Sequence, residues 1–283
     1  MFEAIFRLPS ETQPRRSRWP AIRTLVALGA LVALIGWIVV QSQPAQIDML
    51  QGLPRDGLVA ADAGAPEVGG KWVVTSGSLL TRNGELWSGR PDAGPPDPAH
   101  GRTGSAVLRA VSTHRDFENV RVSIEMALTA LVTTTRTSAH AWDGVHIFLR
   151  YQNAADLYVV DLTRRDGTLT IKRKRSVAAG PSPSTSAGPG GLATQDADLS
   201  NGGLYTTLAT THHSLSHGWH RYELSCTNGP QGVTITLSVD GNVLLTAVDT
   251  DTSALRGPGG VGLRGDNANF TIRKFIIEPE PGK

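Results

Sequence analysis

The sequence of 283 residues lacks a second cysteine, an excess of charge of either sign and a convincing amphipathic helix. With Cys226 as the only cysteine, no intramolecular disulfide can form. In the segment HRYELSC, Cys226 falls on the same strand face as Tyr222 and Leu224, so we expect a small apolar side chain in the core. An intermolecular disulfide or a reactive thiol is the alternative.

The net charge of +2 gives no electrostatic footprint for nucleic acid, so we expect no nucleic-acid partner. The one concentrated run of positive charge outside the N-terminal region is 172–175 (KRKR). We interpret this run as a solvated strand end, or as a sheet edge blunted by charge.

A run of seventeen residues without a charge, Thr24–Val40, is present near the N-terminus. A helix needs about 20 residues to cross the hydrocarbon core of a bilayer. Arginines precede the run, and the first charge after it is acidic, at Asp48. Because positive charge stays cytoplasmic, the pattern predicts a single-pass signal anchor with the N-terminus inside and the rest of the chain outside. The basic residues are Arg7, Arg15, Arg16, Arg18 and Arg23.

A cleaved signal peptide is the alternative, but the run is long for one and only a poor cleavage site lies near Ala45. We therefore divide the chain into a cytoplasmic tail (1–23), a transmembrane anchor (24–40), a linker (41–53) and an extracytoplasmic domain (54–283). The chain is rich in Gly, Ala and Arg and has few Lys, which indicates a bacterial source with a GC-rich genome.

The remaining chain carries period-two patterns that are typical of strands with one buried face. Residues 120–131, 145–151 and 232–240 alternate in this way, with Val122, Ile124, Val145, Ile147 and Leu149 expected in the core. Asp166-Gly167 and Asp240-Gly241 predict tight hairpins, since a type I′ turn needs positive φ. The Pro-, Gly- and Ser-rich segment 176–203 is expected to be a flexible loop. Many strands with little helix predict an all-β antiparallel sandwich.

Five segments resemble the concanavalin A-like lectin/glucanase superfamily, of laminin G-like jelly-roll type. In order they are GGKWVVTSGSLLTRNGELWSG, DFENVRVSIEMAL, WDGVHIFLRYQNAADLYVVDLTRRDGTLTIKRK, GWHRYELSCTNGPQGVTITLSVDGNVLL and GGVGLRGDNANFTIRKFIIEP. Together they cover most of residues 56–279 in the order that the superfamily has them. The resemblance implies a two-sheet antiparallel jelly-roll sandwich and glycan as a common ligand, but a fold does not fix a function.

The resemblance implies two kinds of chemistry, hydrolysis and binding. Glucanases of the superfamily carry an E-x-D-x-x-E strand, which this chain lacks. Its nearest substitute is Glu125 with Asp161, and paired carboxylates are what a glycoside hydrolase needs. We take charges on the solvent face of a sheet as the simpler interpretation of both residues.

A binding face is easier to support. If the apolar strand residues face the core, polar ones line the opposite face, and Trp142 and Tyr158 lie there or at its rim. Aromatic rings and planar hydrogen-bonding groups are suited to binding sugars. An ordinary solvated or covered face is the alternative. The candidates are Arg121, Ser123, Glu125, Trp142, His146, Arg150 and Tyr158.

Two metal hypotheses follow. His212, His213, His217 and His220 are close in sequence, as zinc ligands can be, but no acidic or cysteine partner stands at ligand spacing. The resemblance implies a structural calcium, for which Asp266 and Asn267 are the visible oxygen donors. An Asp/Asn turn without metal is the simpler interpretation.

The function that the sequence favours is non-catalytic recognition of a polysaccharide by a membrane-anchored, extracytoplasmic lectin-like module. The first alternative is a glycoside hydrolase, and the second is a structural or protein-interaction scaffold.

Overall fold

The computed structural model describes residues 46–61, 69–92, 97, 100–102, 104–133, 138–176, 203–215 and 218–280. Within these ranges the chain forms strands and turns, with no α-helix. No helix of the described part is long and apolar enough to cross a membrane, and the expected anchor, 24–40, lies outside it. Of the expected loop 176–203, only its two ends are described, as the last residue of one strand and the first of another.

The first sheet has nine antiparallel strands, in the order β14-β13-β12-β7-β16-β5-β4-β2, with β1 paired to β16. Their bounds are β1 Ile47–Asp48, β2 Gly57–Ala61, β4 Ser78–Arg82, β5 Glu85–Trp87, β7 Val120–Leu131, β12 Gly218–Gly229, β13 Gly232–Val239, β14 Asn242–Asp249 and β16 Ala268–Pro279.

The second sheet has seven antiparallel strands, in the order β11-β10-β9-β8-β15-β6-β3. Their bounds are β3 Trp72–Ser76, β6 Val107–Ser112, β8 Gly144–Asn153, β9 Asp156–Arg164, β10 Thr168–Ser176, β11 Gly203–His212 and β15 Gly260–Asp266. The fold is therefore all-β, with two antiparallel sheets, and is consistent with the expected jelly-roll sandwich.

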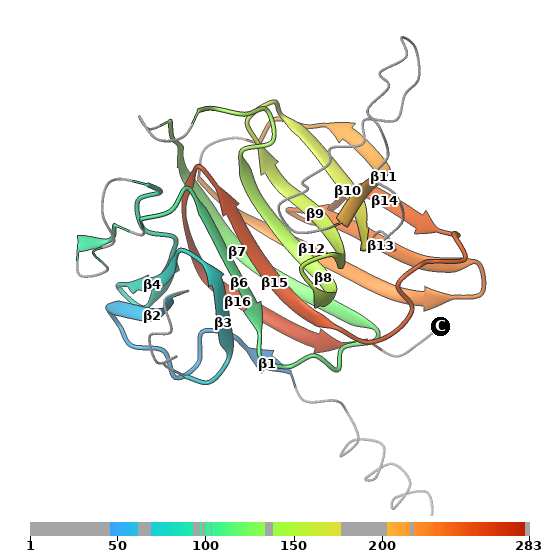
Figure 1. Ribbon diagram of the computed structural model, residues 1–283, viewed down its shortest axis with the longest axis horizontal. Helices are drawn as coiled ribbons and strands as arrows, with labels where there is room; N and C mark the ends of the chain where they lie inside the picture. Colours follow the sequence, from blue (N-terminus) through green and yellow to red (C-terminus); the bar gives the residue numbers. More distant parts are fainter. Residues whose placement is uncertain are drawn as a thin grey trace, which may run out of the picture. The chain divides into compact units, whose positions relative to one another are not determined.

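The two sheets lie one over the other, with a single large apolar core between them (Figure 1). The alternation on β7 and β8 is confirmed where it predicted the core, since Val122, Ile124, Val145, Ile147 and Leu149 are all fully buried. Cys226 of β12 is buried in the same core, as expected. Burying such side chains removes apolar surface from water, which stabilises the sandwich by about 25 cal/mol per Å².

Aromatic and polar contacts fix the sheets against each other. Trp72 of β3 meets Phe275 of β16 edge to face, with ring centroids 5.3 Å apart. Between β9, β10 and β14, the Tyr158 hydroxyl of β9 donates to Asp249 of β14 at 2.7 Å. Arg173 of β10 donates to the same carboxylate at 2.8 Å. The two hydrogen bonds to Asp249 satisfy buried polar groups, which would destabilise the fold if they had no partner.

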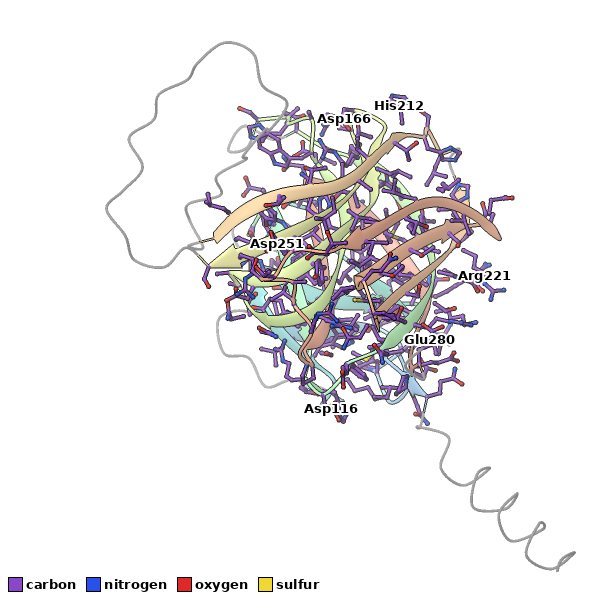
Figure 2. The ribbon with its side chains drawn as sticks, turned by 90° about the vertical axis from the view of Figure 1, so that its right-hand side faces the viewer. Asp116, Asp166, His212, Arg221, Asp251 and Glu280 are labelled. Carbon is purple, nitrogen blue, oxygen red and sulfur yellow. The ribbon has the colours of Figure 1, made fainter. Side chains whose placement is uncertain are left out.

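Both expected hairpins form. Asp240 and Gly241 connect β13 to β14 with φ of +50° and +83°, as a two-residue turn of primed type requires. The β9–β10 turn is one residue longer, and of its residues Gly167 has positive φ. β11 pairs with β10 up to His212, which brings His212 to the same end of the sandwich as Asp166 (Figure 2).

The sandwich begins earlier than expected. Residues 47–53 were assigned to the linker, but β1 pairs with β16 and Met49 is buried in the core. The Lys71 ammonium donates to the carbonyl oxygens of Asp48 and Gln51, which holds this segment against the sheets. A strand of two residues carries too little pattern to be recognised from sequence.

Candidate functional site

The expected binding residues do not share one face. Arg121 and Glu125 of β7 lie on the outer face of the nine-stranded sheet, where Arg121 pairs with Glu280 at 2.6 Å and Glu125 pairs with Arg273 at 2.8 Å. His146 and Asp161 lie on the outer face of the seven-stranded sheet, with the core between the two sets. Glu125 and Asp161 therefore cannot flank one glycosidic bond, and the hydrolase hypothesis built on this pair is wrong.

Arg150 is not on an outer face either. A β-bulge in β8 places an extra residue between Phe148 and Tyr151 relative to β15, and Arg150 adopts φ of +50° there. Its guanidinium turns inward, is fully buried, and donates to the Leu255 carbonyl oxygen at 2.6 Å and to Asn228 Oδ1 at 2.7 Å. The expectation that Arg150 contacts ligand is wrong because the bulge reverses the alternation.

The two expected aromatic residues are also separated. Tyr158 is fully buried in the core, where its hydroxyl accepts from the Leu255 amide. Trp142 lies in the turn before β8, 43% exposed, with its ring stacked on His140 at 4.5 Å. Of the expected binding residues, only His146 belongs to the site described below, and Trp142 lies beyond the strands that form it.

The expected metal ligands have other partners. Both oxygens of Asp266 accept from Arg264 Nε, at 2.8 and 3.0 Å, and Asn267 donates to Ser138 and Asp143. A calcium ion at Asp266 would face the cationic Arg264, so Asp266 fits the ion poorly, while Asn267 Oδ1 is buried without a hydrogen-bond partner. Among the described residues, no group of three or more His, Cys, Asp or Glu side chains is arranged to hold a metal.

The histidine cluster does not assemble in the described part of the chain. His212 and His213 are exposed, and His220 Nδ1 lies 2.7 Å from Asp240 Oδ2. His217 is outside the described residues.

A row of polar side chains crosses the outer face of the seven-stranded sheet. Arg109 of β6 is the register partner of Arg264 of β15, which is the partner of His146 of β8. His146 is in turn the partner of Asp161 of β9, which accepts a hydrogen bond from Thr170 of β10. Strand pairing between distant segments thus brings five polar side chains into one line.

His146 sits between two carboxylates within this row. Its Nδ1 lies 2.6 Å from Asp161 Oδ1, and its Nε2 lies 3.2 Å from Asp266 Oδ2 without hydrogen-bond geometry. Burial alone would lower the pKa of His146, but the two carboxylates outweigh it and raise that pKa. Burial opposes ionisation of the carboxyls as well, yet the charge of His146 lowers the pKa of Asp161, and Arg264 with His146 lowers that of Asp266 to about 2.

Beside the polar row lies an apolar floor. Phe148 and Tyr151 of β8 stack with ring centroids 5.9 Å apart, and the Arg115 guanidinium lies 4.8 Å from the Tyr151 ring centroid. This floor is a second apolar cluster, separate from the core. It comprises Val111, Phe148, Tyr151, Leu157 and Val159, with Tyr205 packed against it.

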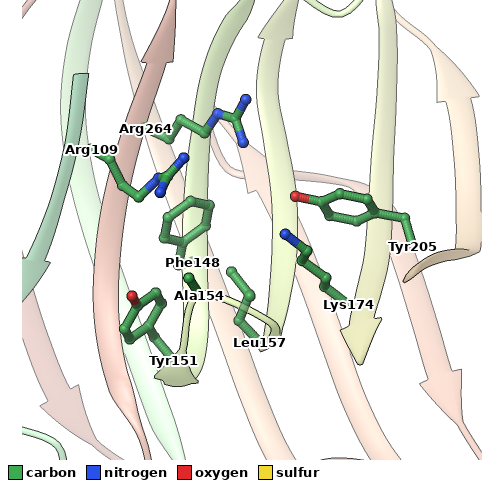
Figure 3. Close-up of a pocket in the computed structure, with 8 residues that line it drawn as sticks. All are labelled: Arg109, Phe148, Tyr151, Ala154, Leu157, Lys174, Tyr205 and Arg264. Carbon is green, nitrogen blue, oxygen red and sulfur yellow. The ribbon is translucent and has the colours of Figure 1, made fainter. Parts of the chain in front are cut away.

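A shallow pocket opens over this floor, as Figure 3 shows. Arg109 and Arg264 line one side, while the Lys174 ammonium and the Tyr205 hydroxyl point toward Phe148 from the other. Its empty volume is about 210 Å³, open solvent included, so it cannot enclose a drug-sized molecule. The eight lining residues include three cations and no acid: Arg109, Phe148, Tyr151, Ala154, Leu157, Lys174, Tyr205 and Arg264.

The basic run 172–175 helps to build this pocket. β10 lies between β9 and β11, so the run is not at a sheet edge, and Arg173 and Lys174 are buried, so the interpretation as a solvated strand end is wrong as well. The Lys174 ammonium lies 5.0 Å from the Tyr205 ring centroid, and the Lys172 ammonium lies 5.9 Å from it. The side chain of Arg173, between these two lysines, points to the opposite face of β10 and donates to Asp249.

Sequence reasoning missed most of the residues of this site. The alternation over 145–151 puts Tyr151 on the same face as Leu149, and the β8 bulge reverses this. The basic run 172–175 drew attention to Lys174. Only the position of β10 inside the sheet shows that this lysine faces the pocket. Arg109, Arg264 and Tyr205 carry no local signal, because pairing between strands that are distant in the sequence brings them together, Arg264 with Arg109 and Tyr205 with Lys174.

No known protein family matches the sequence, and no curated protein matches it either. Solved structures with similar architecture include the metal-free carbohydrate recognition domain of Emp46p (10% identity, 82% of this chain, 98% of that chain, TM-score 0.48). They also include the endo-1,3-beta-glucanase from Streptomyces sioyaensis (15%, 85%, 97%, 0.43) and winged bean acidic lectin complexed with methyl-alpha-D-galactose (9%, 83%, 98%, 0.44). Similarity at this level assigns no activity to the chain.

Proposed function

We propose that the protein binds glycan, without cleaving it, through the outer face of the seven-stranded sheet. The observation that carries this proposal is the pocket over Phe148, where aromatic rings and planar guanidinium groups meet. Rings of Tyr and Phe offer an apolar surface to the C–H faces of a sugar, and Arg offers donors in a fixed fork to its oxygens. A shallow open pocket suits a chain of sugars, of which one or two units contact the protein at a time.

The carboxylates near the pocket favour binding over hydrolysis. A glycosidase needs one carboxyl group whose pKa is raised, so that it can protonate the leaving oxygen. Asp161 and Asp266 have lowered pKa values instead, and both are held by basic partners. They remain ionised at neutral pH and act here as structural counter-ions of His146 and the arginines.

A glycan array probed with the full-length chain in detergent micelles tests the proposal. Tyr205→Ala removes a ring from the pocket, whereas Trp219→Ala removes an exposed ring from the outer face of the nine-stranded sheet. We expect Tyr205→Ala to weaken glycan binding about tenfold or more, equivalent to about 1.4 kcal/mol, and Trp219→Ala to leave it unchanged. Loss of binding with Trp219→Ala alone would place the site on the other sheet.

The scaffold alternative makes a different prediction from the same array. If no glycan is retained by a chain whose melting temperature shows it folded, the protein is not a lectin. The array should be run with calcium and with a chelator, and the poor fit of Asp266 to calcium predicts equal binding in both.

We further propose that residues 24–40 anchor the protein in the membrane with the described domain outside. The uncharged run and its basic flank support this. The full-length protein should stay in membranes after carbonate extraction, and protease added to intact cells should remove the domain. Recovery of a soluble mature form that starts near Gln46 would contradict the anchor.

A further inference from the structure

The pocket over Phe148 carries more positive charge than a neutral sugar requires. Arg109 and Arg264 are direct register partners on β6 and β15, and like charges directly opposite on neighbouring strands destabilise a sheet. Arg264 is matched by Asp266, but among the residues that the structure describes none accepts a hydrogen bond from Arg109. An anion from outside the chain would stabilise a cation that is half-buried beside a like charge.

The surroundings of Arg109 reinforce this point. Burial and the neighbouring Arg264 charge lower the pKa of Arg109, and the more distant Asp266 offsets this only in part. Lys174 approaches the same pocket from the opposite side, and Lys172 lies near it over the Tyr205 ring. Arg115, whose Nη1 is buried without a hydrogen-bond partner, lies over the face of Tyr151. Asp161 and Asp266, which lie in the polar row on the same face, already pair with basic side chains.

We propose that the ligand is an anionic saccharide, whose carboxylate or sulfate group binds between Arg109 and Lys174 while its ring lies on the aromatic floor. This inference rests on the proposed function and names the class of glycan. The fork of an arginine matches a carboxylate or sulfate through two parallel hydrogen bonds, and the low local polarity of the floor strengthens such charge-assisted bonds. The site would therefore recognise both the anionic group of the saccharide and its sugar ring.

The test uses the full-length chain in detergent and matched pairs of oligosaccharides. Each oligouronate is compared with its carboxyl-reduced form, which keeps the backbone and removes the charge, and a sulfated oligosaccharide is compared with its desulfated form. We expect the charged member of a pair to bind about 10- to 100-fold more tightly, the factor that hydrogen bonds to a charged group supply. Which charged ligand binds distinguishes carboxylate from sulfate. Binding should weaken as salt rises, because screening shortens the reach of the charges.

Arg109→Gln should remove most of this preference, and Arg121→Gln, the same change on the other sheet, should not. Arg109→Lys should recover only part of it, since the charge remains and the fork is lost. If Arg109→Gln does not fold, Lys172→Gln on the same face provides the second variant and should lower the preference and its salt dependence.

Equal binding of charged and neutral members, unaffected by Arg109→Gln, would overturn the anionic ligand and leave glycan binding intact. Equal losses with Arg109→Gln and Arg121→Gln would show an unspecific charge effect and would also overturn it. If neither member of any pair binds, the proposed function itself fails.

Discussion

His146 Nδ1 lies 2.6 Å from Asp161 Oδ1, and both side chains are almost fully buried although they belong to the outer face of a sheet. Asp161 also contacts Arg164 and Thr170, and Asp266 approaches the imidazole from the other side with Arg264 behind it. This network joins β8, β9, β10 and β15 beside the proposed binding site, so its charge state should contribute to the stability of the sheet.

The pair predicts a pH dependence of stability. Because the pKa of His146 is raised in the folded state, its contribution is fully present below about 6.5 and is lost as pH rises through the folded pKa. The lowered pKa values of Asp161 and Asp266 give a contribution that is present above about 3.8 and lost as pH falls.

His146→Gln should therefore lower the free energy of unfolding by about 3–5 kcal/mol at pH 5.5, since it leaves buried carboxylates without their partner. The difference between the two proteins should shrink toward pH 9. Urea denaturation at several pH values measures both, and a difference that stays constant with pH would show that His146 is not charged in the folded protein.

Arg150→Ala should destabilise the fold rather than impair binding alone. The substitution leaves the buried Leu255 carbonyl oxygen and Asn228 without their donor, and hydrogen bonds to a charged group contribute about 1.5–3 kcal/mol each. Calorimetry should show a clear fall in the melting temperature. An unchanged melting temperature with weakened glycan binding would instead restore Arg150 as a ligand-binding residue.

Neighbouring residues on β7 should behave in opposite ways. Ile124→Ala empties a fully buried site and should cost about 2–5 kcal/mol. Glu125→Ala breaks a surface pair with Arg273 and should cost about 1 kcal/mol or less, with glycan binding unchanged. Chemical denaturation and the glycan array measure the two effects, and lost binding with Glu125→Ala would locate ligand on the nine-stranded sheet.

Cys226 should be inert in the folded protein. Burial raises the pKa of its thiol to about 11, although Arg150 opposes this, and the thiolate is the reactive form. A thiol reagent should modify the native protein far more slowly than the protein in denaturant. Rapid modification of the native chain would show that β12 opens or that the side chain is accessible.

The alternation of apolar residues predicted which side chains of β7 and β8 fill the core, because burial of one face imposes a period of two on a strand. Alternation within one strand does not say to which sheet the strand belongs. Arg121 and His146 were for this reason assigned to one face, although β7 and β8 lie in different sheets.

Two further errors have local causes. The bulge at Arg150 inserts one residue, so that Arg150 turns inward and Tyr151 outward, and no sequence signal marks it. Tyr158 could have been placed correctly, because it is three residues from Asp161 and alternation puts the two on opposite faces. The pocket itself depends on the pairing of β6 with β15 and of β10 with β11, which only the folded chain shows.

The most direct test of the account is to find where a glycan touches the protein. A photoreactive oligosaccharide that binds the full-length chain would be crosslinked, and the modified residues would be mapped by mass spectrometry. Adducts on β8, β10 and β11, at Tyr151, Lys174 and Tyr205, are the predicted result. Adducts confined to β7, β12 and β16, around Trp219 and Arg273, would contradict a site on the seven-stranded sheet.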